Sequence, residues 1–383
     1  MRILTHCYEF PPLGGGGAKV VYGLSTRLVQ MGHEVDLVTM NFRGLKKTES
    51  VEGINVHRVP CFRAKESVCH APEMLSYILA AIPRTYRLVK EKGFDLNHTH
   101  FIFPDGVVSY VIKKLTGLPY IITIHGSDVP GYNPDRFAYQ HKFLGPLWQR
   151  VVQSASQIVS PSDTLKSLLH RHCSTASVVT IPNGLLPTKF SPDVEKTNRI
   201  LVVSRMFARK GIQYVLQALA TLQNDNIREV NIVGDGPHLA TLKHMARTLR
   251  VQAKFWGHLD NTSPELKHLY ETSQIFVFPS EAENFPIVLL EAMGAGLAII
   301  TTQGTGCAEV VGETGMLVPP KNVNAIRKNL IQLMNEPELC KRLGMAARKR
   351  FEKSFTWDVV TKQYEEIYER FGRSHSSYCY QRK

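Results

Sequence analysis

Long apolar runs, a paired set of cysteines and a signal-peptide core are all missing from this sequence of 383 residues. No run approaches the roughly 18 apolar residues that a transmembrane helix needs. Seven cysteines are an odd number and include no Cys-x-x-Cys pair. This argues against a disulfide framework and against a zinc site of the usual spacing. We therefore expect a cytoplasmic protein.

Three common phosphate-binding motifs are also absent: the metal-binding Asp-x-Asp pair, the dinucleotide-binding glycine fingerprint and the P-loop. No Asp-x-Asp pair, the usual metal-binding solution for a diphosphate, occurs in the chain. The glycine run at residues 14–17 is separated from the first strand by residues 9–13, and Lys19 stands where a dinucleotide fingerprint needs its third glycine. Val20 stands where a P-loop needs Ser or Thr. An NAD-dependent oxidoreductase and a P-loop protein are therefore disfavoured.

Positive charge is in excess, with 46 Lys and Arg against 33 Asp and Glu and a net charge of +13. Basic residues cluster at 84–92 and 113–114, and again at 341–350. One interpretation is peripheral contact with anionic lipid at the inner face of the membrane, and the other is ordinary solvated helix faces. Nucleic acid is not expected as a partner, because no recognised binding module occurs.

Apolar segments of strand length alternate with helical segments in two successive rounds. Strands are predicted to begin near residues 2, 35, 55, 95, 120 and 157, and then near 199, 229, 253, 275 and 298. Such alternation is typical of parallel sheets covered by helices on both faces. A chain of 383 residues also exceeds the usual size of one core. We predict an α/β protein with two doubly wound domains, with ligand sites beyond the carboxyl ends of the strands.

Two carboxylates lie around a short apolar helix that is predicted between two strands. Glu283 falls in the strand-to-helix loop, Pro286 fits the first helical position, and Glu291 lies two turns further on. A carboxylate can accept hydrogen bonds from two adjacent sugar hydroxyls at once. We therefore interpret the pair as a clamp for a sugar nucleotide, with one carboxylate for a hexose and one for the ribose.

Seven glycine-rich or charged blocks are spread along the chain, and the segment with Glu283 and Glu291 is the last of them. They comprise residues 11–17, 32–35, 125–128, 181–184, 203–211, 233–237 and 279–302. Together they resemble the retaining glycosyltransferases of family 4, which have the GT-B fold. The ordered set spans almost the whole chain and is far more specific than any single block.

The resemblance implies two Rossmann-like domains that face a central cleft. Residues 1–183 would form an acceptor-binding domain and residues 184–355 a nucleotide-sugar-binding domain. A helix at residues 356–372 is expected to return to the first domain, and residues 373–383 are expected to form a disordered tail.

Four residues are assigned to the donor diphosphate by the resemblance. Positions that match Arg205 and Lys210 bind the diphosphate in the family, which implies catalysis without a metal or another cofactor. Gly15 and Gly16 would bring backbone amides close to the diphosphate and the acceptor. A solvated basic loop and a flexible surface loop are the alternative interpretations of these two segments.

Histidines follow two of the predicted strands. His125 precedes a glycine, so its ring is expected on the ligand side of the sheet, and by resemblance it contacts the donor sugar and stabilises charge near the anomeric carbon. Asp128 is expected to orient that ring or to contact the acceptor. His98 and His100 share one face of a strand, but no third ligand accompanies them, so no metal site is expected.

The predicted function is transfer of a hexose from a UDP- or GDP-sugar to a glycolipid or surface polysaccharide, with retention of configuration. No convincing nucleophilic carboxylate is present in the family pattern, so a front-face mechanism is expected, in which the leaving phosphate accepts the acceptor proton. Glu283 would then hold sugar hydroxyls. Two alternatives stay open, a sugar-nucleotide epimerase or hydrolase of the same fold and a non-catalytic sugar-nucleotide binding protein.

Two positions depart from the family pattern. Pro286 replaces a common glycine and removes a backbone amide that could meet the sugar, and Leu186 replaces a common aspartate. The resemblance therefore does not extend to the choice of donor sugar.

Overall fold

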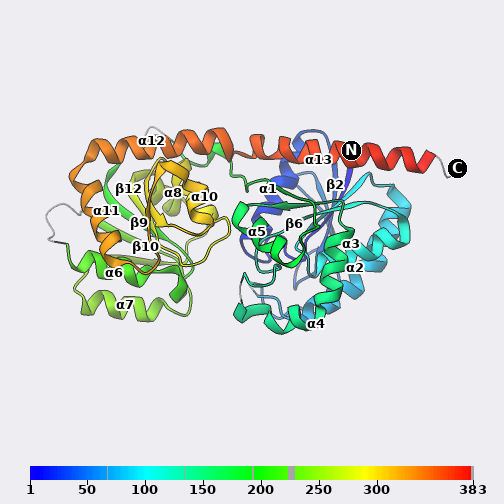
Figure 1. Cartoon of the computed structure of the whole chain (residues 1–383), viewed down its shortest axis with the longest axis horizontal. Coiled ribbons are helices and arrows are strands. Elements are labelled where there is room, and N and C mark those ends of the chain that lie inside the picture. The colour runs from blue at the N-terminus through cyan, green and yellow to red at the C-terminus, as the bar shows by residue number, and fades with distance from the viewer. Residues whose placement is uncertain (67, 133, 192–193, 223–228, 381–383) are drawn as a thin grey trace. The chain divides into compact units, whose positions relative to one another are not determined.

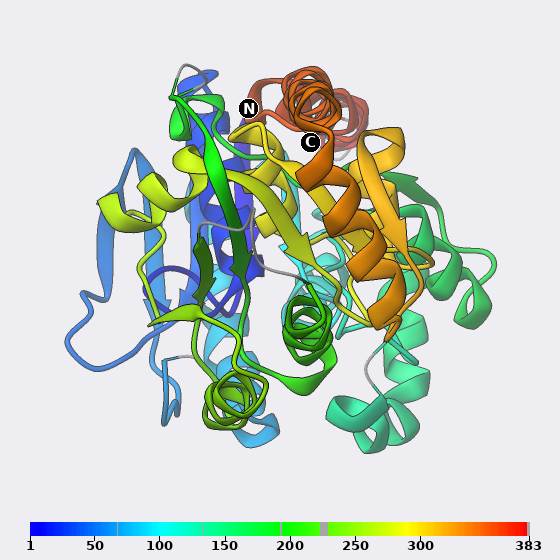
Figure 2. The same cartoon turned by 90° about the vertical axis from the view of Figure 1, so that its left-hand side faces the viewer.

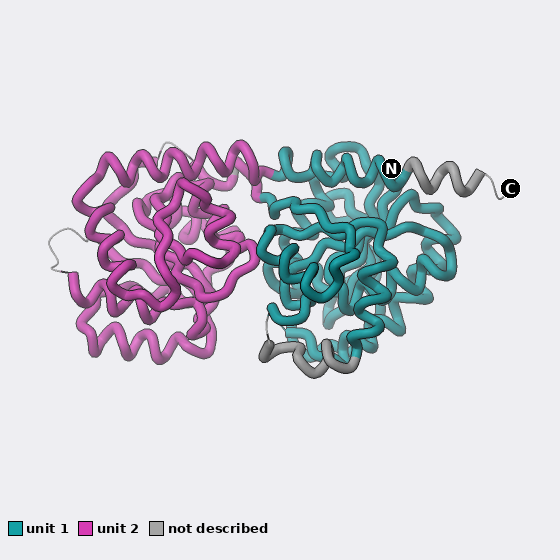
Figure 3. Tube along the Cα trace, viewed as in Figure 1, with its two compact units in different colours: residues 1–184, 357–383 teal, residues 185–356 magenta. Residues whose placement is uncertain are grey.

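The chain folds into two compact units. The computed structural model describes residues 1–66, 68–132, 134–191, 194–222 and 229–380. Side chains are described for all of these residues except 134–143, 188 and 373–380. Unit 1 comprises Met1–Gly184 and Trp357–Lys383, and unit 2 comprises Leu185–Thr356 (Figure 3). The division after Gly184 falls one residue from the boundary expected after residue 183.

Unit 1 is built on an eight-stranded sheet within the described residues (Figure 1). Its strands are β1 (Arg2–His6), β2 (Glu34–Met40), β3 (Thr48–Val51), β4 (Ile54–Val59), β5 (Leu96–His100), β6 (Tyr120–Thr123), β7 (Gln157–Ser160) and β8 (Val178–Thr180). Its helices are α1 (Gly16–Gln30), α2 (Ala71–Lys92), α3 (Asp105–Thr116), α4 (Pro134–Ser154), α5 (Asp163–His172) and α13 (Trp357–Tyr380).

The strand order in this sheet is β3-β4-β2-β1-β5-β6-β7-β8. Every neighbouring pair is parallel except β3 with β4. The chain moves outward from β1 through β2 and then returns to place β5 on the other side of β1. This reversal is the topological switch point, where doubly wound sheets bind ligands beyond the strand ends.

Unit 2 contains a six-stranded parallel sheet within the described residues, in the order β11-β10-β9-β12-β13-β14. The strands are β9 (Thr197–Val203), β10 (Glu229–Val233), β11 (Ala253–Gly257), β12 (Ser273–Phe278), β13 (Ala298–Thr302) and β14 (Gly315–Val318). The α-helices are α6 (Ile212–Ala220), α7 (Leu239–Thr248), α8 (Pro264–Thr272), α9 (Ile287–Gly294), α10 (Gly306–Val311), α11 (Val323–Asn335) and α12 (Pro337–Ser354), with short 3-10 turns η1 (Pro187–Lys189), η2 (Ala208–Lys210) and η3 (Gly312–Thr314).

Alternating residues of the unit 2 strands supply two apolar cores. On β12, Ile275 and Val277 pack into the core that contains residues of α6, α7 and α11. Phe276 and Phe278 of the same strand pack into the core that contains residues of α8, α9 and α10. This period of two puts helices on both faces of the sheet (Figures 1 and 2). The strand order then places the switch point of unit 2 between β9 and β12.

The structure differs from the sequence prediction at several element ends. The short strands β3, β8 and β14 were not predicted, because they are short and carry weak apolar patterns. Pro286 is the N-cap of α9, so the helix begins one residue later than expected. Helix α13 continues to Tyr380, beyond the expected end at residue 372, since no proline interrupts it. Residues 381–383 of the expected tail lie outside the described residues.

Candidate functional site

The loop after β9 places a lysine against a carboxylate from the loop after β12. Gly211 ends this loop with a φ of +75°, and a Cβ there would lie 2.3 Å from the main-chain oxygen of Pro279. Only glycine permits this close approach between the two loops. The Nζ atom of Lys210, a residue that is 8% exposed, forms an ion pair with Oε1 of Glu283. The two predicted residues therefore meet at the switch point.

Glu283 is fixed by further polar contacts. The hydroxyl of Ser280 donates to its Oε1 at 2.6 Å, and the backbone N–H of Gly306 donates to its main-chain oxygen at 3.0 Å. Burial lowers the pKa of Lys210, the Glu283 carboxylate opposes that effect, and the positive charge of Arg205 adds to the lowering. Arg205 itself is exposed, and its guanidinium carbon lies 5.4 Å from the ring centre of Phe207.

Glu291 lies on α9 with a separate set of partners. Its Oε2 accepts a hydrogen bond from the Tyr270 hydroxyl at 2.9 Å. Its Oε1 pairs with the ammonium of Lys189 and accepts from the Asn261 amide at 3.3 Å. Glu291 is only 2% exposed. A buried carboxylate is stable here because each oxygen has a donor.

In unit 1, the glycine-rich run forms the start of α1. Gly15 is the N-cap and Gly16 the first helical residue. Both are exposed, and a Cβ added to either would meet nothing within 4 Å. The open space in front of these backbone amides suits an anion at the positive end of a helix.

Close packing in this run falls instead on the two flanking glycines. A Cβ on Gly14, where φ is +92°, would lie 2.5 Å from Oε2 of Glu9, and a Cβ on Gly17 would lie 2.7 Å from the Phe101 ring. These contacts fix the path of the loop. The sequence predicts ligand contacts at Gly15 and Gly16, and at these two positions no neighbouring atom of the protein would meet a Cβ.

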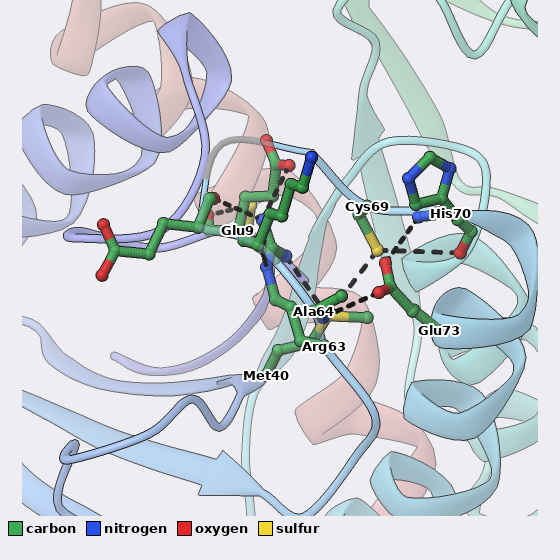
Figure 4. A network of polar contacts seen from close by, with 10 residues as sticks. Glu9, Met40, Arg63, Ala64, Cys69, His70 and Glu73 are labelled. Carbon is green, nitrogen blue, oxygen red and sulfur yellow. Dashed lines mark hydrogen bonds and ion pairs between the residues drawn. The ribbon is translucent and has the colours of Figure 1, made fainter.

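A buried arginine supports the same loop. Figure 4 shows Arg63 beside Glu9 and Met40. Its Nη2 donates to Glu9 Oε1 at 3.3 Å and to the main-chain oxygen of Glu66 at 2.8 Å. That oxygen also accepts the backbone N–H of Gly14 at 3.0 Å. The pairing of Glu9 with Arg63 was not predicted, because 54 residues separate them in sequence.

His125 follows β6, as predicted, and its ring packs against aromatic neighbours. The ring centres of His125 and Phe101 lie 4.4 Å apart, and Nε2 lies 3.2 Å from Nδ1 of His100. Burial lowers the pKa of His125 to about 3. The ring is therefore neutral near pH 7 and can both donate and accept a hydrogen bond.

Asp128 holds backbone amides and not the ring of His125. Its Oδ1 accepts from the N–H of His125 at 3.1 Å and of Gly126 at 2.9 Å, and its Oδ2 accepts from the N–H of Ile102 at 3.0 Å. Burial raises the pKa of the carboxyl, although these donors oppose it. The structure thus links Asp128 to the shape of the loop, and contact with an acceptor stays a prediction.

Among the described residues, no cluster of three or more His, Cys, Asp or Glu side chains has the arrangement to hold a metal ion. The described helices also include none with the length and apolar character to cross a bilayer. A cavity of about 410 Å³ in unit 2 is lined by Arg199, Glu229, Trp256 and His268 among others. Since Arg199 and Glu229 lie near the amino ends of β9 and β10, this cavity is distinct from the loops that carry Lys210 and Glu283.

Two family models match successive parts of the chain. One described as Glycosyltransferase Family 4 matches residues 14–188, and one described as Glycosyl transferases group 1 matches residues 188–350. N-acetyl-alpha-D-glucosaminyl L-malate synthase from Bacillus anthracis is 26% identical over 383 residues, which cover 96% of this chain and 96% of that protein.

Solved structures have the same fold. Sucrose-phosphate synthase from Thermosynechococcus elongatus superposes with a TM-score of 0.81 at 20% identity, covering 97% of this chain and 99% of that one. HepE from Anabaena, in complex with UDP-glucose, superposes with a TM-score of 0.75 at 15% identity, covering 97% and 100%. The two Rossmann-like units thus have the GT-B architecture. The chain belongs to glycosyltransferase family 4.

Proposed function

We propose that this glycosyltransferase moves a hexose from a UDP- or GDP-sugar to a glycolipid or surface-polysaccharide acceptor, with retention of configuration. The observation that carries the proposal is the pairing of Lys210 with Glu283 at the switch point of unit 2, next to the helix that carries Glu291. A sugar nucleotide offers a diphosphate to the cation and hydroxyl groups to the carboxylates. The same fold in HepE holds UDP-glucose, which supports a nucleotide-sugar donor.

The proposed chemistry needs no enzyme nucleophile. The bond between the anomeric carbon and the donor phosphate breaks, and the acceptor oxygen attacks the anomeric carbon from the same face. The proton of the acceptor hydroxyl passes to the leaving phosphate. Lys210 and Arg205 stabilise the charge that develops on the diphosphate, and Glu283 holds hydroxyls of the sugar.

Two cations in one loop support catalysis without a metal. Arg205 and Lys210 lie in the loop that follows β9, and the positive charge of Arg205 lowers the pKa of Lys210. Guanidinium and ammonium groups both neutralise phosphate oxygens. We propose that these residues replace the divalent ion that other glycosyltransferases use, and the EDTA arm of the experiment below tests this.

Unit 1 is proposed to act on the sugar and the acceptor. The neutral ring of His125 would contact a donor-sugar hydroxyl, and the amides of Gly15 and Gly16 would contact the diphosphate. Helix α2 exposes Leu75 (57%) and Leu79 (67%) one turn apart. Basic residues follow on the same helix, so α2 supports peripheral contact with an anionic membrane that carries a lipid-linked acceptor.

Thermal-shift measurements with UDP, GDP, ADP and their sugar conjugates test the donor site. We expect a stabilising shift from a single nucleotide, unchanged by EDTA. Glu291→Gln should weaken binding about 10- to 100-fold, because a charge-assisted hydrogen bond to the ribose is replaced by a neutral one. The shift at a fixed ligand concentration would fall accordingly.

A matched substitution separates this effect from general damage. Glu281 lies in the loop between β12 and α9, and its carboxylate contacts Tyr214 and Lys321. Glu281→Gln should leave the thermal shift intact. No shift from any nucleotide on folded protein would contradict the transferase proposal. Release of free sugar without an acceptor would point to a hydrolase, and tight binding without turnover would point to a binding protein.

Gly15→Ala tests the glycine-rich loop without disturbing the fold. The melting temperature should not change, because the added Cβ meets nothing within 4 Å. If the backbone amide approaches the diphosphate, turnover should fall at least about tenfold, because a loss of about 1.4 kcal/mol in the free energy of this interaction corresponds to a factor of ten. Gly145→Ala is the control, as its Cβ is equally open. Equal turnover of the two variants would remove Gly15 from the donor site.

A further inference from the structure

Three imidazole rings lie in a row that runs along β5 to the residue just beyond β6. The ring centres of His98 and His100 lie 4.3 Å apart, and those of His100 and His125 lie 5.4 Å apart with planes inclined by 24°. His98 and His100 alternate along β5, so they share one face of the sheet. The row therefore leads from the interior of unit 1 to His125.

The inner end of the row is fixed by the C-terminal helix. Nδ1 of His98 lies 2.7 Å from the hydroxyl of Tyr368, and its Nε2 lies 2.8 Å from the hydroxyl of Thr123. That threonine hydroxyl is also 3.1 Å from the hydroxyl of Tyr364. Tyr364 and Tyr368 are buried and one turn apart on α13, so both reach the sheet from the same face of the helix.

The middle ring has one hydrogen-bonded nitrogen and one buried nitrogen without a partner. Nδ1 of His100 faces Nε2 of His125 at 3.2 Å, whereas Nε2 of His100 has no hydrogen-bond partner among the described residues. A proton on Nε2 would leave a buried N–H unsatisfied, which is rarer in folded proteins than an under-satisfied acceptor. The proton of His100 is therefore better placed on Nδ1, from which it can be donated to His125.

This arrangement determines which nitrogen of His125 carries its proton. If His100 donates from Nδ1, then Nε2 of His125 must accept, and the single proton of the neutral His125 ring lies on Nδ1. Burial keeps the pKa of His100 well below its ordinary value and that of His125 near 3, so both rings are neutral at pH 7.

We infer that His100 is a positioning residue that holds His125 in the Nδ1–H form, and that His98 with Tyr364 and Tyr368 of α13 fixes His100. The inference rests on the proposed role of His125 at the donor sugar. His125 then presents an N–H donor to a sugar oxygen. The contribution of the C-terminal helix is to secure the inner end of the row.

The protonation site is measured by ¹⁵N NMR of the full chain with labelled histidine, because the two neutral forms of imidazole give different shifts at each ring nitrogen. We expect His125 to be Nδ1–H in the wild type. In His100→Phe, which retains a ring and removes the donor, Nε2 of His125 should lose the hydrogen bond that it accepts, and its ¹⁵N shift should change to that of an unbonded acceptor nitrogen. His100→Gln supplies an amide donor and should restore the wild-type shift.

Turnover is measured on the same variants. His100→Phe should lower kcat by about 10- to 100-fold with little change in KM, similar to losses seen when residues that orient a functional histidine are removed. His100→Gln should recover most of this loss. Tyr368→Phe removes the hydroxyl at the inner end and should give a smaller decrease of the same kind.

The outcomes separate this inference from the proposed function. A wild-type His125 with its proton on Nε2, or an Nε2 shift that is the same in the wild type and His100→Phe, would overturn the inference whatever the activity. A change of this shift with unchanged turnover would support the contact with His100 and remove His125 from the proposed chemistry. Should His100→Phe not fold, the wild-type spectrum and His100→Gln still decide between these results.

Discussion

Lys210→Ala should lower kcat/KM for sugar transfer by about 100- to 1000-fold, the range seen when one preorganised group that stabilises developing charge is removed. Lys210 is 8% exposed and already held by Glu283, so its ammonium needs little reorganisation when a diphosphate leaves. The low local dielectric strengthens its effect on that charge. Steady-state kinetics with the donor identified by thermal shift measure the change.

The partner carboxylate requires its own control. Lys210→Ala removes the cation beside the largely buried Glu283 carboxylate and leaves the Ser280 hydroxyl as a donor to its Oε1, so some stability will be lost. Combining Lys210→Met with Glu283→Gln removes both charges and should recover stability but not activity. Recovery of activity in this double variant would contradict the role of Lys210 at the diphosphate.

Substitution of a nearby exposed lysine tests whether the loss of one positive charge is by itself enough to slow sugar transfer. The Lys321 ammonium lies 3.3 Å from Glu281, and its side chain is 63% exposed. Lys321→Ala should leave transfer nearly unchanged, because an exposed ion pair is worth little and is screened by salt. A similar loss in both variants would indicate a general effect of net charge on donor binding.

The strands that carry this site could be predicted from sequence because they are buried on both faces. The run from Ile275 to Phe278 is apolar at every position, and both alternating faces enter a core. The loop that follows such a strand is then placed at the carboxyl end of the sheet. The positions of Lys210 and Glu283 relative to their strands follow from this rule alone.

The partners of the site residues could not be predicted in the same way. Lys189 pairs with Glu291 across 102 residues of sequence, and it lies in a short turn without any motif. Tyr368 reaches His98 across 270 residues. Such contacts depend on how helices pack against the sheet, which local pattern does not encode. Asp128 is similar, because its three backbone donors come together only when β5 and β6 are paired.

Acidification from pH 7 to pH 5 should destabilise unit 1 strongly. Burial lowers the pKa of His6 to about 4 and of His98 and His125 to about 3, and it holds that of His100 well below its ordinary value. In the unfolded chain each would titrate near about 6.5. Below that pH the unfolded state binds more protons, so stability falls as the pH decreases toward the folded pKa values.

The size of the effect follows from the number of protons involved. Each histidine contributes a slope that rises toward about 1.4 kcal/mol per pH unit as the pH falls below about 6.5. Burial raises the pKa of Asp105 and Asp128, which acts in the opposite direction, because a carboxyl with a raised pKa takes up a proton more readily in the folded state. Two uncompensated histidines would still give a slope of up to about 3 kcal/mol per pH unit, which is large beside a total stability of about 5–15 kcal/mol.

Urea unfolding at pH 7, 6 and 5 measures this slope, and two variants identify its source. His98→Gln removes one buried titrating group and should reduce the slope by about 1.4 kcal/mol per pH unit. Tyr368→Phe deletes a hydrogen bond to the same ring without removing a histidine, so it should lower stability by a similar amount at every pH. A free energy of unfolding of unit 1 that is equal at pH 7 and pH 5 would show that the histidine row accepts protons without unfolding. The His125 ring would then not be confined to its neutral form by the fold.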